Sequence, residues 1–259
     1  MKLGTFTRRT ALAAAAAFML CGSASAADTW RVATEGTFPP FEFYNSQTGE
    51  IQGFEVDLVR AMAKKMGKEL HLETMSFDAI IPAILSGTID TGAAGFSVTP
   101  ERAKRVLFST PFYKSGLTIV VPNANKAGIK DFKDLEGKRI SVQLGTTSMT
   151  YAKEIKGAKV TTFNSAGDAL LNVLAGNGDA IINDKPVTDY MLAQNKSLAS
   201  QCTHLKPIAT ADLFAMVMAK GNDKLKAEID KALKDLKADG TFNELHKKWF
   251  GVDADPELP

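Results

Sequence analysis

The sequence predicts an α/β fold made of two similar lobes that face a shared cleft. Strand and helix signals alternate along the chain after residue 26, two extended runs interrupt them, and one phrase occurs twice. Its copies, 84–90 (ILSGTID) and 173–179 (VLAGNGD), each end an apolar helical stripe at Gly, with an Asp before the next strand. Five residues after each Asp stand Gly95 and Asp184. Because α/β sheets bind ligands beyond the carboxyl ends of their strands, the repeat indicates two equivalent strand ends at one cleft.

The first 26 residues have the composition of an export signal. Lys2, Arg8 and Arg9 form a basic segment, 11–20 is apolar, and Ala24-Ser25-Ala26 is a small-residue cleavage site. The apolar segment is shorter than the ~20 residues that span a bilayer. We therefore expect a signal peptide, 1–26, cleaved near Ala26, and an exported protein.

Charge and cysteine content exclude several classes of partner. The formal net charge is +2, and losing three basic residues with the signal peptide lowers it by three, to −1. A near-neutral exported protein has no electrostatic attraction for nucleic acid or anionic lipid. Removal of Cys21 leaves Cys202 alone, so no intramolecular disulfide is expected.

No signature of catalysis, cofactor or metal is found in the sequence. The three histidines lack metal-ligand spacing, and neither a P-loop nor a dinucleotide-binding motif occurs. The pattern favours a binding protein without cofactor or metal over an enzyme.

Periodicity and capping residues define the elements of the first half. A strand at 30–33 precedes a loop with Pro39-Pro40, and Val56, Leu58, Val59 and Met62 then follow helical spacing over 56–66. Thr99 caps a short helix that has Pro100 at its first position. The other elements expected in this half are a strand at 70–74, a helix at 78–85 and a strand at 91–94.

The second half repeats the alternation between two extended runs, 112–121 and 213–219. Strands are expected at 139–142, 159–162 and 180–183, and helices at 149–155, 166–174, 186–193, 223–238 and 242–250. The extended runs predict that the chain leaves the first lobe and later returns to it. We expect lobe 1 at 27–112 and 214–259, lobe 2 at 117–208, and hinges at 112–116 and 209–214.

Three positions suggest a site for a zwitterion. Arg102 follows the strand end at Gly95 by seven residues, and its guanidinium could grip a carboxylate, although a solvated helix face is the plainer reading. The segment 145–148 (GTTS) opens a helix, where free N–H groups attract carboxylate oxygens or simply form a cap. Asp184 follows a buried strand and needs a cationic partner. This partner is either Lys185 or a ligand ammonium, which would also donate to the Ser97 hydroxyl and the Gly95 carbonyl.

Seven segments together resemble family 3 periplasmic solute-binding proteins for polar amino acids. They are 32–43 (VATEGTFPPFEF), 53–58 (GFEVDL), 95–102 (GFSVTPER), 108–113 (FSTPFY), 145–148 (GTTS), 240–243 (GTFN) and 248–251 (KWFG). The resemblance covers essentially the whole chain after the signal peptide. It implies a two-lobed type II periplasmic binding protein fold with a discontinuous first lobe and two hinge strands.

The resemblance also implies roles for single residues. Arg102 and the Thr147 backbone would bind the α-carboxylate of an amino acid, and Gly95, Ser97 and Asp184 would bind its α-amino group. Phe38 and Phe77 would sandwich its carbon chain, although burial rates alone favour core positions for both. Glu35, Gln143 and Asn183 would face the ligand side chain.

Two of these positions depart from glutamine-binding members of the family. Those members look to have Lys at Gln143 and His at Asn183, so glutamine specificity is open. A buried Glu35 without that Lys favours arginine or lysine on local physics, whereas likeness along the whole chain favours glutamine.

The resemblance implies the receptor of an ABC-type amino-acid importer, which closes about a hinge and docks transiently on an inner-membrane permease. We expect a monomer that binds a free polar L-amino acid. A cyclohexadienyl or arogenate dehydratase-like enzyme, with Glu35 as its acid, is the alternative. A sensory ligand-binding module is a third and weaker interpretation.

Overall fold

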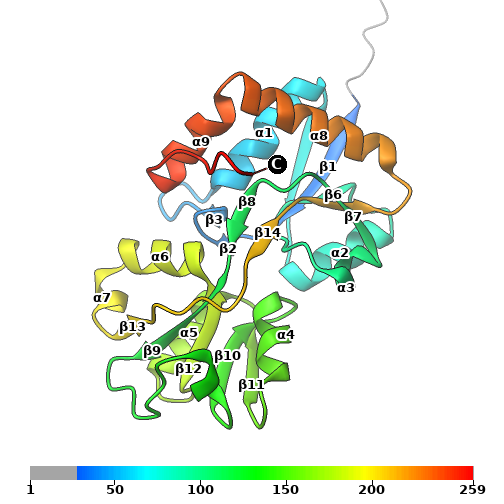
Figure 1. Cartoon of the computed structure of the whole chain (residues 1–259). Coiled ribbons are helices and arrows are strands. Elements are labelled where there is room, and N and C mark those ends of the chain that lie inside the picture. The colour runs from blue at the N-terminus through cyan, green and yellow to red at the C-terminus, as the bar shows by residue number, and fades with distance from the viewer. Residues whose placement is uncertain (1–27, 259) are drawn as a thin grey trace, which may run out of the picture.

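The computed structural model describes residues 28–258, so the predicted signal peptide lies outside the described part of the chain. Two lobes lie one above the other in Figure 1, each built on a five-stranded sheet. A two-stranded and a three-stranded sheet complete the strand pairing of the described chain. The α/β class and the two lobes predicted from the sequence are confirmed.

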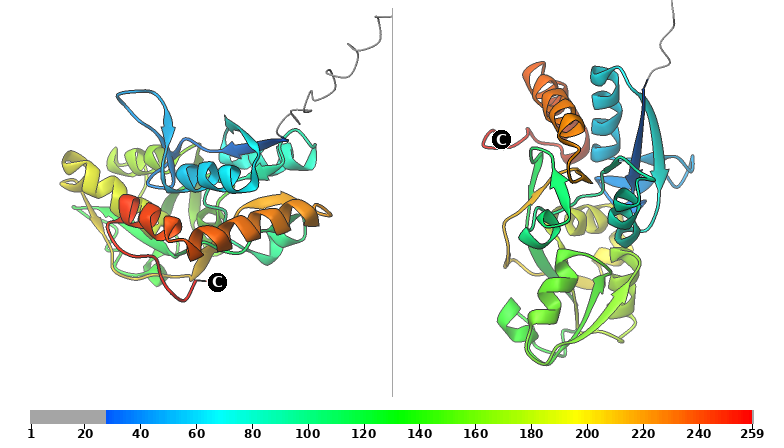
Figure 2. Two further views of the ribbon diagram at one scale, coloured as in Figure 1. Left: turned by 90° about the horizontal axis from the view of Figure 1, so that it is seen from above. Right: turned by 90° about the vertical axis from the view of Figure 1, so that its right-hand side faces the viewer.

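The first lobe contains a sheet of order β5-β1-β6-β15-β7. Its strands are β1 (Thr29–Thr34), β5 (Glu69–Thr74), β6 (Thr91–Gly92), β7 (Val106–Phe108) and β15 (Val217–Ala219). Its helices are α1 (Phe54–Met66), α2 (Phe77–Leu85), α3 (Pro100–Ala103), α8 (Asp223–Ala238) and α9 (Thr241–Phe250). Trp30 and Val32 pack with α1 and α8, whereas Ala33 packs with α2, so the alternating residues of β1 serve opposite faces. Figure 2 shows α1, α8 and α9 gathered on one of these faces.

The second lobe repeats this plan with a sheet of order β11-β10-β12-β9-β13. Its strands are β9 (Leu117–Pro122), β10 (Arg139–Gln143), β11 (Lys159–Phe163), β12 (Ala180–Asp184) and β13 (Cys202–His204). Its helices are η1 (Phe132–Leu135), α4 (Thr147–Glu154), α5 (Ala166–Leu174), α6 (Lys185–Gln194) and α7 (Lys196–Ala199). Ile182 packs in the cluster that contains α4, and Ile181 in the one that contains α5.

Both large sheets are mixed: four strands of each run in one direction and one strand is reversed. The reversed strand is β15 in the first lobe, antiparallel to β6 and β7, and β9 in the second lobe, antiparallel to β12 and β13. Each reversed strand follows directly after a chain crossing, so it enters its sheet from the other lobe. The crossings between the lobes therefore decide strand direction.

Two short strands lie where the chain passes between the lobes. They are β8 (Tyr113–Ser115) and β14 (Asp212–Phe214), which pair antiparallel and run side by side in Figure 1. Each is followed by a strand of a large sheet, β9 in one lobe and β15 in the other.

The repeated phrase has the same structural role in both lobes. Asp90 accepts hydrogen bonds from the backbone N–H of Arg31 at 2.9 Å and from its Nη2 at 2.6 Å. Asp179 accepts from the N–H of Arg139 at 2.8 Å and from its Nη2 at 2.7 Å. In the first lobe this carboxylate joins the turn before β6 to β1, and in the second lobe it joins the turn before β12 to β10. The repeat is therefore architectural.

The segment expected as a loop after β1 contains three short strands. They are β2 (Thr37–Phe38), β3 (Glu42–Tyr44) and β4 (Ile51–Gln52), which form a small antiparallel sheet. Strands of two or three residues are too short to show periodicity in a sequence. Phe41 of this segment is fully buried against Phe54, Phe214 and Phe250, so the segment also closes the core of the first lobe.

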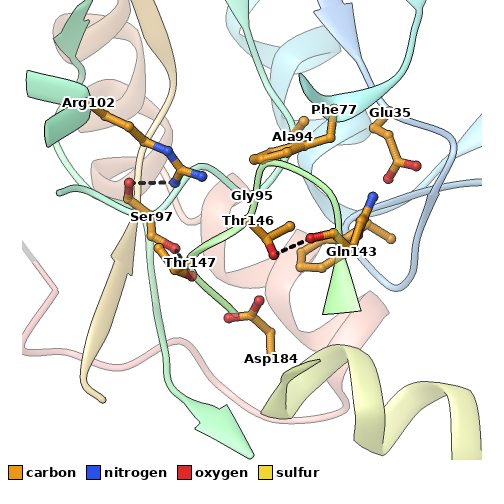
Figure 3. Close-up of a pocket in the computed structure, with 11 residues that line it drawn as sticks. Glu35, Phe77, Ala94, Gly95, Ser97, Arg102, Gln143, Thr146, Thr147 and Asp184 are labelled. Carbon is orange, nitrogen blue, oxygen red and sulfur yellow. Dashed lines mark hydrogen bonds between the residues drawn. The ribbon is translucent and has the colours of Figure 1, made fainter. Parts of the chain in front are cut away.

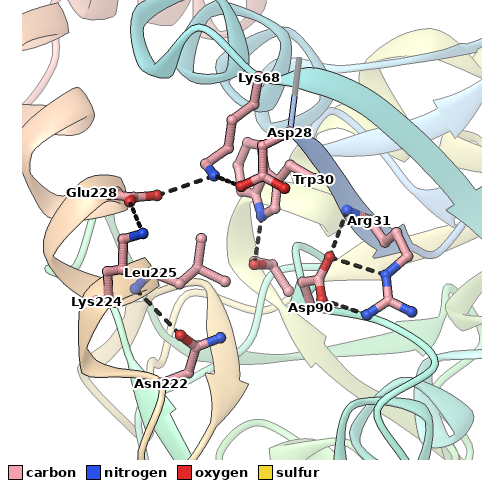
Figure 4. A network of polar contacts seen from close by, with 10 residues as sticks. Asp28, Trp30, Arg31, Lys68, Asp90, Asn222, Lys224, Leu225 and Glu228 are labelled. Carbon is pink, nitrogen blue, oxygen red and sulfur yellow. Dashed lines mark hydrogen bonds and ion pairs between the residues drawn. The ribbon is translucent and has the colours of Figure 1, made fainter. Parts of the chain in front are cut away.

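A polar network joins the start of β1 to α8, as Figure 4 shows. Lys68 Nζ pairs with Asp28 at 2.6 Å and with Glu228 at 3.3 Å. Nearby, Trp30 Nε1 donates to Thr91 Oγ1 at 2.8 Å, and both residues are buried. Exposed ion pairs contribute little to stability, so the buried Trp30 bond is the stronger constraint on β1.

Candidate functional site

A small cavity lies between the lobes, where strands of both sheets end. Its lining includes residues that end or directly follow β1, β6, β10 and β12, as well as residues of α2 and α3. The lining consists of Glu35, Phe38, Phe77, Ala94, Gly95, Ser97, Arg102, Gln143, Thr146, Thr147 and Asp184 (Figure 3).

The Arg102 guanidinium lies at one end of the cavity, held by both lobes. The Thr99 hydroxyl accepts from the Arg102 backbone N–H at 3.2 Å and so caps α3. Arg102 Nη1 donates to the Ser97 carbonyl at 2.9 Å, and Nη2 donates to the Gly145 carbonyl of the other lobe at 3.1 Å. The guanidinium carbon lies 5.3 Å from the ring centroids of both Phe77 and Phe96. Burial lowers the pKa of Arg102 to about 10, which leaves it charged at neutral pH.

The start of α4 adds backbone donors beside Arg102. The Thr146 hydroxyl donates to the Gln143 carbonyl at 2.8 Å and accepts from the Met149 N–H at 3.2 Å, so it fixes the first turn of the helix. N–H groups in a first turn have no intrahelical acceptor and favour an anion. Thr147 also approaches the other lobe, because its Oγ1 lies 3.5 Å from Ser97 Oγ. A carboxylate between Arg102 and this turn would meet donors from both lobes.

Asp184 forms an acidic position at the end of β12. The residue is 4% exposed, and Ser115 Oγ donates to its Oδ1 at 2.8 Å. Burial raises the pKa of Asp184 to about 7, against the lowering effects of the Ser115 bond and the Arg102 charge. Lys185, the competing partner, instead pairs with Asp189. An ammonium group in the cavity would stabilise the ionised form of Asp184.

We expect amino-acid affinity to depend on pH through Asp184. The folded pKa of about 7 lies above the unfolded 3.8. The protonated side chain therefore stabilises the free protein at low pH, and this stabilisation is lost as the pH rises through about 7. Binding of an ammonium needs the ionised form, so affinity should rise by about tenfold from pH 6 to pH 8.

Calorimetry of amino-acid binding at both pH values would measure this effect. Asp184→Asn should weaken the binding of every amino acid and reduce the dependence of affinity on pH. A variant with the wild-type affinity at both pH values would refute the assignment of Asp184 to the ammonium group.

Glu35 and Gln143 lie at the far end of the cavity from Arg102 (Figure 3). Glu35 is 4% exposed, accepts from the Thr37 hydroxyl and interacts with the Gln143 amide. Burial raises its pKa. No lysine or arginine pairs with Glu35 in the described chain, so it offers an unneutralised acidic position.

The rings of Phe38 and Phe77 and the Gly95 backbone form the remaining walls. Gly95 has φ +59°, and a Cβ there would lie 2.7 Å from Phe38 Cε1. Only glycine therefore allows the Phe38 ring to lie against this turn. The ring of Phe77 stacks on Phe96, with centroids 4.5 Å apart, so Phe77 serves both core and cavity.

The structure brings together nine of the ten residues predicted for the site. Asn183 does not line the cavity; its amide instead donates to Thr188 Oγ1 at 3.2 Å. Neighbours on a strand point to opposite faces, so Asp184 and Asn183 do not face the same space. Sequence reasoning missed Ala94 and Thr146, although the helix cap in 145–148 was a usable signal for Thr146.

Two further findings concern the described residues as a whole. No helix among them is long and apolar enough to cross a membrane. No group of three or more His, Cys, Asp or Glu side chains within 28–258 is arranged to hold a metal ion.

Comparisons with known proteins agree with this geometry. The family model for bacterial extracellular solute-binding proteins, family 3, matches residues 30–252. ABC transporter arginine-binding protein 1 of Escherichia coli (strain K12) is 31% identical over 231 residues, which are 88% of this chain and 93% of that protein.

Solved structures give the same result. An ancestral arginine-binding protein bound to arginine has 38% identity and a TM-score of 0.82, covering 87% of this chain and all of the other. A structure of an ancestral arginine-binding protein bound to glutamine has a TM-score of 0.78 at 38% identity over 86% of this chain and 98% of that chain. An ancestral amino acid-binding protein, described as a precursor of cyclohexadienyl dehydratase, has a TM-score of 0.77 and 37% identity over 86% and 95%.

The match over most of the chain, the two lobes and the cavity between them lead to one assignment. This chain belongs to the bacterial extracellular solute-binding proteins of family 3 and has their two-lobed, type II periplasmic binding fold.

Proposed function

We propose that this protein is the extracytoplasmic receptor of an ABC-type amino-acid importer and that its ligand is a basic L-amino acid, arginine first. One observation carries the proposal: Arg102, Asp184 and Glu35 line one interlobe cavity, at positions suited to a carboxylate, an ammonium and a cationic side chain.

Charge balance favours arginine over glutamine. With Asp184 and Glu35 ionised, the three groups carry a net charge of −1. Arginine has a net charge of +1 and would neutralise the cavity, whereas glutamine would leave a buried carboxylate unpaired, which is unfavourable. The arginine-binding relatives support this order. Glutamine is the second candidate, because the raised pKa of Glu35 allows a neutral carboxyl to face an amide, and a related ancestral protein is described as binding glutamine.

The binding mechanism is closure of the lobes about the crossings near β8 and β14. We place lobe 1 at 27–112 and 214–259, lobe 2 at 117–208, and the hinges at 112–116 and 209–214. The bond from Arg102 to the Gly145 carbonyl is an example of a contact that a closed form gains. A ligand that touches both lobes shifts the equilibrium toward closure by its greater affinity for that form.

Gly145→Ala should hinder closure. Gly145 has φ +78°, and a Cβ there would lie 3.1 Å from Asp78 Cβ in the other lobe. We expect amino-acid affinity to fall about tenfold beyond any loss of stability. Gly157→Ala is the matched control: it has a similar φ of +70°, but its nearest neighbour, 3.5 Å away, is Gly137 of the same lobe. Equal affinities of the two variants by calorimetry would contradict a role for this contact in closure.

Export to the periplasm, docking of the closed form on an inner-membrane permease and a monomeric state complete the proposal. The signal-peptide composition of 1–26 and the family assignment support export. The ABC-transporter relatives support permease docking.

A thermal-shift screen against the common L-amino acids tests the ligand. A ligand at 100 times its dissociation constant stabilises the folded state by ~2.7 kcal/mol. Arginine should give the largest shift, followed by lysine and glutamine, whereas aspartate and glutamate should give none. A dominant shift with glutamate would overturn the charge-balance argument.

An enzyme, a dehydratase of the cyclohexadienyl or arogenate type, is the alternative function. It is favoured by the raised pKa of Glu35, which suits a general acid, and by the likeness to the ancestral precursor of such an enzyme. Incubation with prephenate or arogenate should yield no product if the protein is a receptor. Turnover that Glu35→Gln abolishes would establish the enzyme instead.

A further inference from the structure

Two buried carboxyl groups behind the cavity have no part in the mechanism above. Glu42 of β3 and Glu55 of α1 are both 0% exposed. Neither oxygen of Glu42 finds an N–H or O–H donor in the described chain, nor does Glu55 Oε1. No lysine or arginine of the described chain forms an ion pair with either side chain. Such isolation is costly for two charges, so the arrangement needs an explanation.

The remaining oxygen of Glu55 reaches the ligand site. Glu55 Oε2 accepts a hydrogen bond from the Gly95 N–H at 2.8 Å. Gly95 lines the cavity in the left-handed conformation described above, so this bond holds the turn that directs the Gly95 carbonyl.

The backbone fixes Glu55 firmly in this place. Its N–H donates to the Phe41 carbonyl at 2.9 Å, and a Cβ at Gly53 would lie 2.1 Å from the same oxygen. The first turn of α1 therefore packs directly on the segment that carries Glu42. The backbone of Glu55 is therefore held beside the turn that contains Gly95.

The backbone bond from Glu55 to Phe41 brings the two buried carboxyls close enough for each to affect the pKa of the other. Two carboxylates in such a dry space cannot both be charged, so at least one of them holds a proton. The Gly95 N–H that Glu55 accepts stabilises its ionised form. Glu55 is therefore the group that loses its proton first, and Glu42 is the protonated partner. Burial and the charges of Glu55 and Glu35 raise the pKa of Glu42 well above its usual range, and burial raises the pKa of Glu55 to about 8.

We propose that Glu55 is a positioning residue for the ammonium group of the ligand: it holds the Gly95 peptide in the cavity and is supported by Glu42 as its protonated partner. This inference rests on the proposed function, because it takes the Gly95 carbonyl as an acceptor for that ammonium. The approach of a cation favours ionisation of a nearby carboxyl. Ligand binding therefore releases a proton from the pair.

Calorimetry with L-arginine and L-glutamine at pH 7.5, in two buffers of different ionisation enthalpy, measures affinity and proton release together. Glu55→Gln should lower affinity at least about tenfold and reduce the number of protons released per ligand. Glu55→Ala, which removes the acceptor, should lower affinity further. Glu42→Gln keeps an N–H donor toward Glu55 and should stay within about threefold of wild type. Glu69→Gln, an exposed acid of the same lobe, is the control.

The outcomes separate this inference from the proposed function. If Glu55→Gln lowers only the unfolding temperature, or lowers affinity with unchanged proton release, Glu55 is merely structural and the inference is overturned. If Asp184→Asn weakens binding but Glu55→Gln does not, the inference fails and the proposed orientation of the ligand stands. If neither variant weakens binding, or if neither probe binds the wild type, the proposed function fails and the inference falls with it.

Discussion

Arg102→Ala should abolish amino-acid binding while the free protein still folds. Arg102 is the one arginine or lysine in the cavity lining of the described structure. Its positive charge would pair with the carboxylate of the ligand. Removal of one partner of a buried charge pair costs ~2–5 kcal/mol, which would turn micromolar binding into millimolar. The variant also loses the bond to the Gly145 carbonyl, so closure is weakened as well. Calorimetry with arginine and glutamine measures the loss.

Lys104→Ala is the control for this variant. Lys104 lies two residues further along the chain, and its exposed side chain pairs only with Glu101, at 2.9 Å, in the described structure. Its replacement should leave affinity unchanged, since exposed ion pairs contribute little. Near-normal affinity of Arg102→Ala, with Lys104→Ala as the reference, would disprove the carboxylate clamp.

Glu35→Gln should change the ligand preference of the protein. The variant removes the carboxylate that a guanidinium or ammonium side chain would face, so arginine affinity should fall about 30-fold or more. Glutamine affinity should stay within about threefold, because an amide can pair with an amide. The ratio of the two dissociation constants, measured by calorimetry, reports the change.

The raised pKa of Glu35 adds a pH dependence to this test. Since burial raises that pKa, arginine binding to the wild type should strengthen as the pH rises through the ionisation of Glu35, and Glu35→Gln should remove this part of the profile. Glu50→Gln, an exposed acid in the loop between β3 and β4, should change neither quantity. If Glu35→Gln left the ratio of the arginine and glutamine dissociation constants unchanged, Glu35 would not recognise the side chain of the ligand.

The sequence by itself determined most of the secondary structure and the two-lobed plan. Helical stripes placed α8 at its observed bounds, and the Thr99 cap placed α3. The repeated phrase predicted equivalent strand ends at Gly95 and Asp184, and both line the cavity. These features rest on interactions among residues close in the chain, which a single sequence records directly.

Strand direction and the fine composition of the site were decided only by the tertiary structure. The antiparallel placement of β9 and β15 depends on how the crossings enter each sheet, which periodicity does not record. Asn183 was placed in the site by resemblance, but the pleat of β12 turns its amide to Thr188.

The carboxyl pair behind the cavity shows the same limit most clearly. Glu42 and Glu55 occur in sequence as ordinary acidic residues, yet both are fully buried, and Glu55 binds the N–H of Gly95, 40 residues along the chain. Local pattern predicts elements because backbone hydrogen bonds and side-chain periodicity act within a few residues. The protonation of a buried group depends on which distant residues surround it, and only the packed lobes decide that.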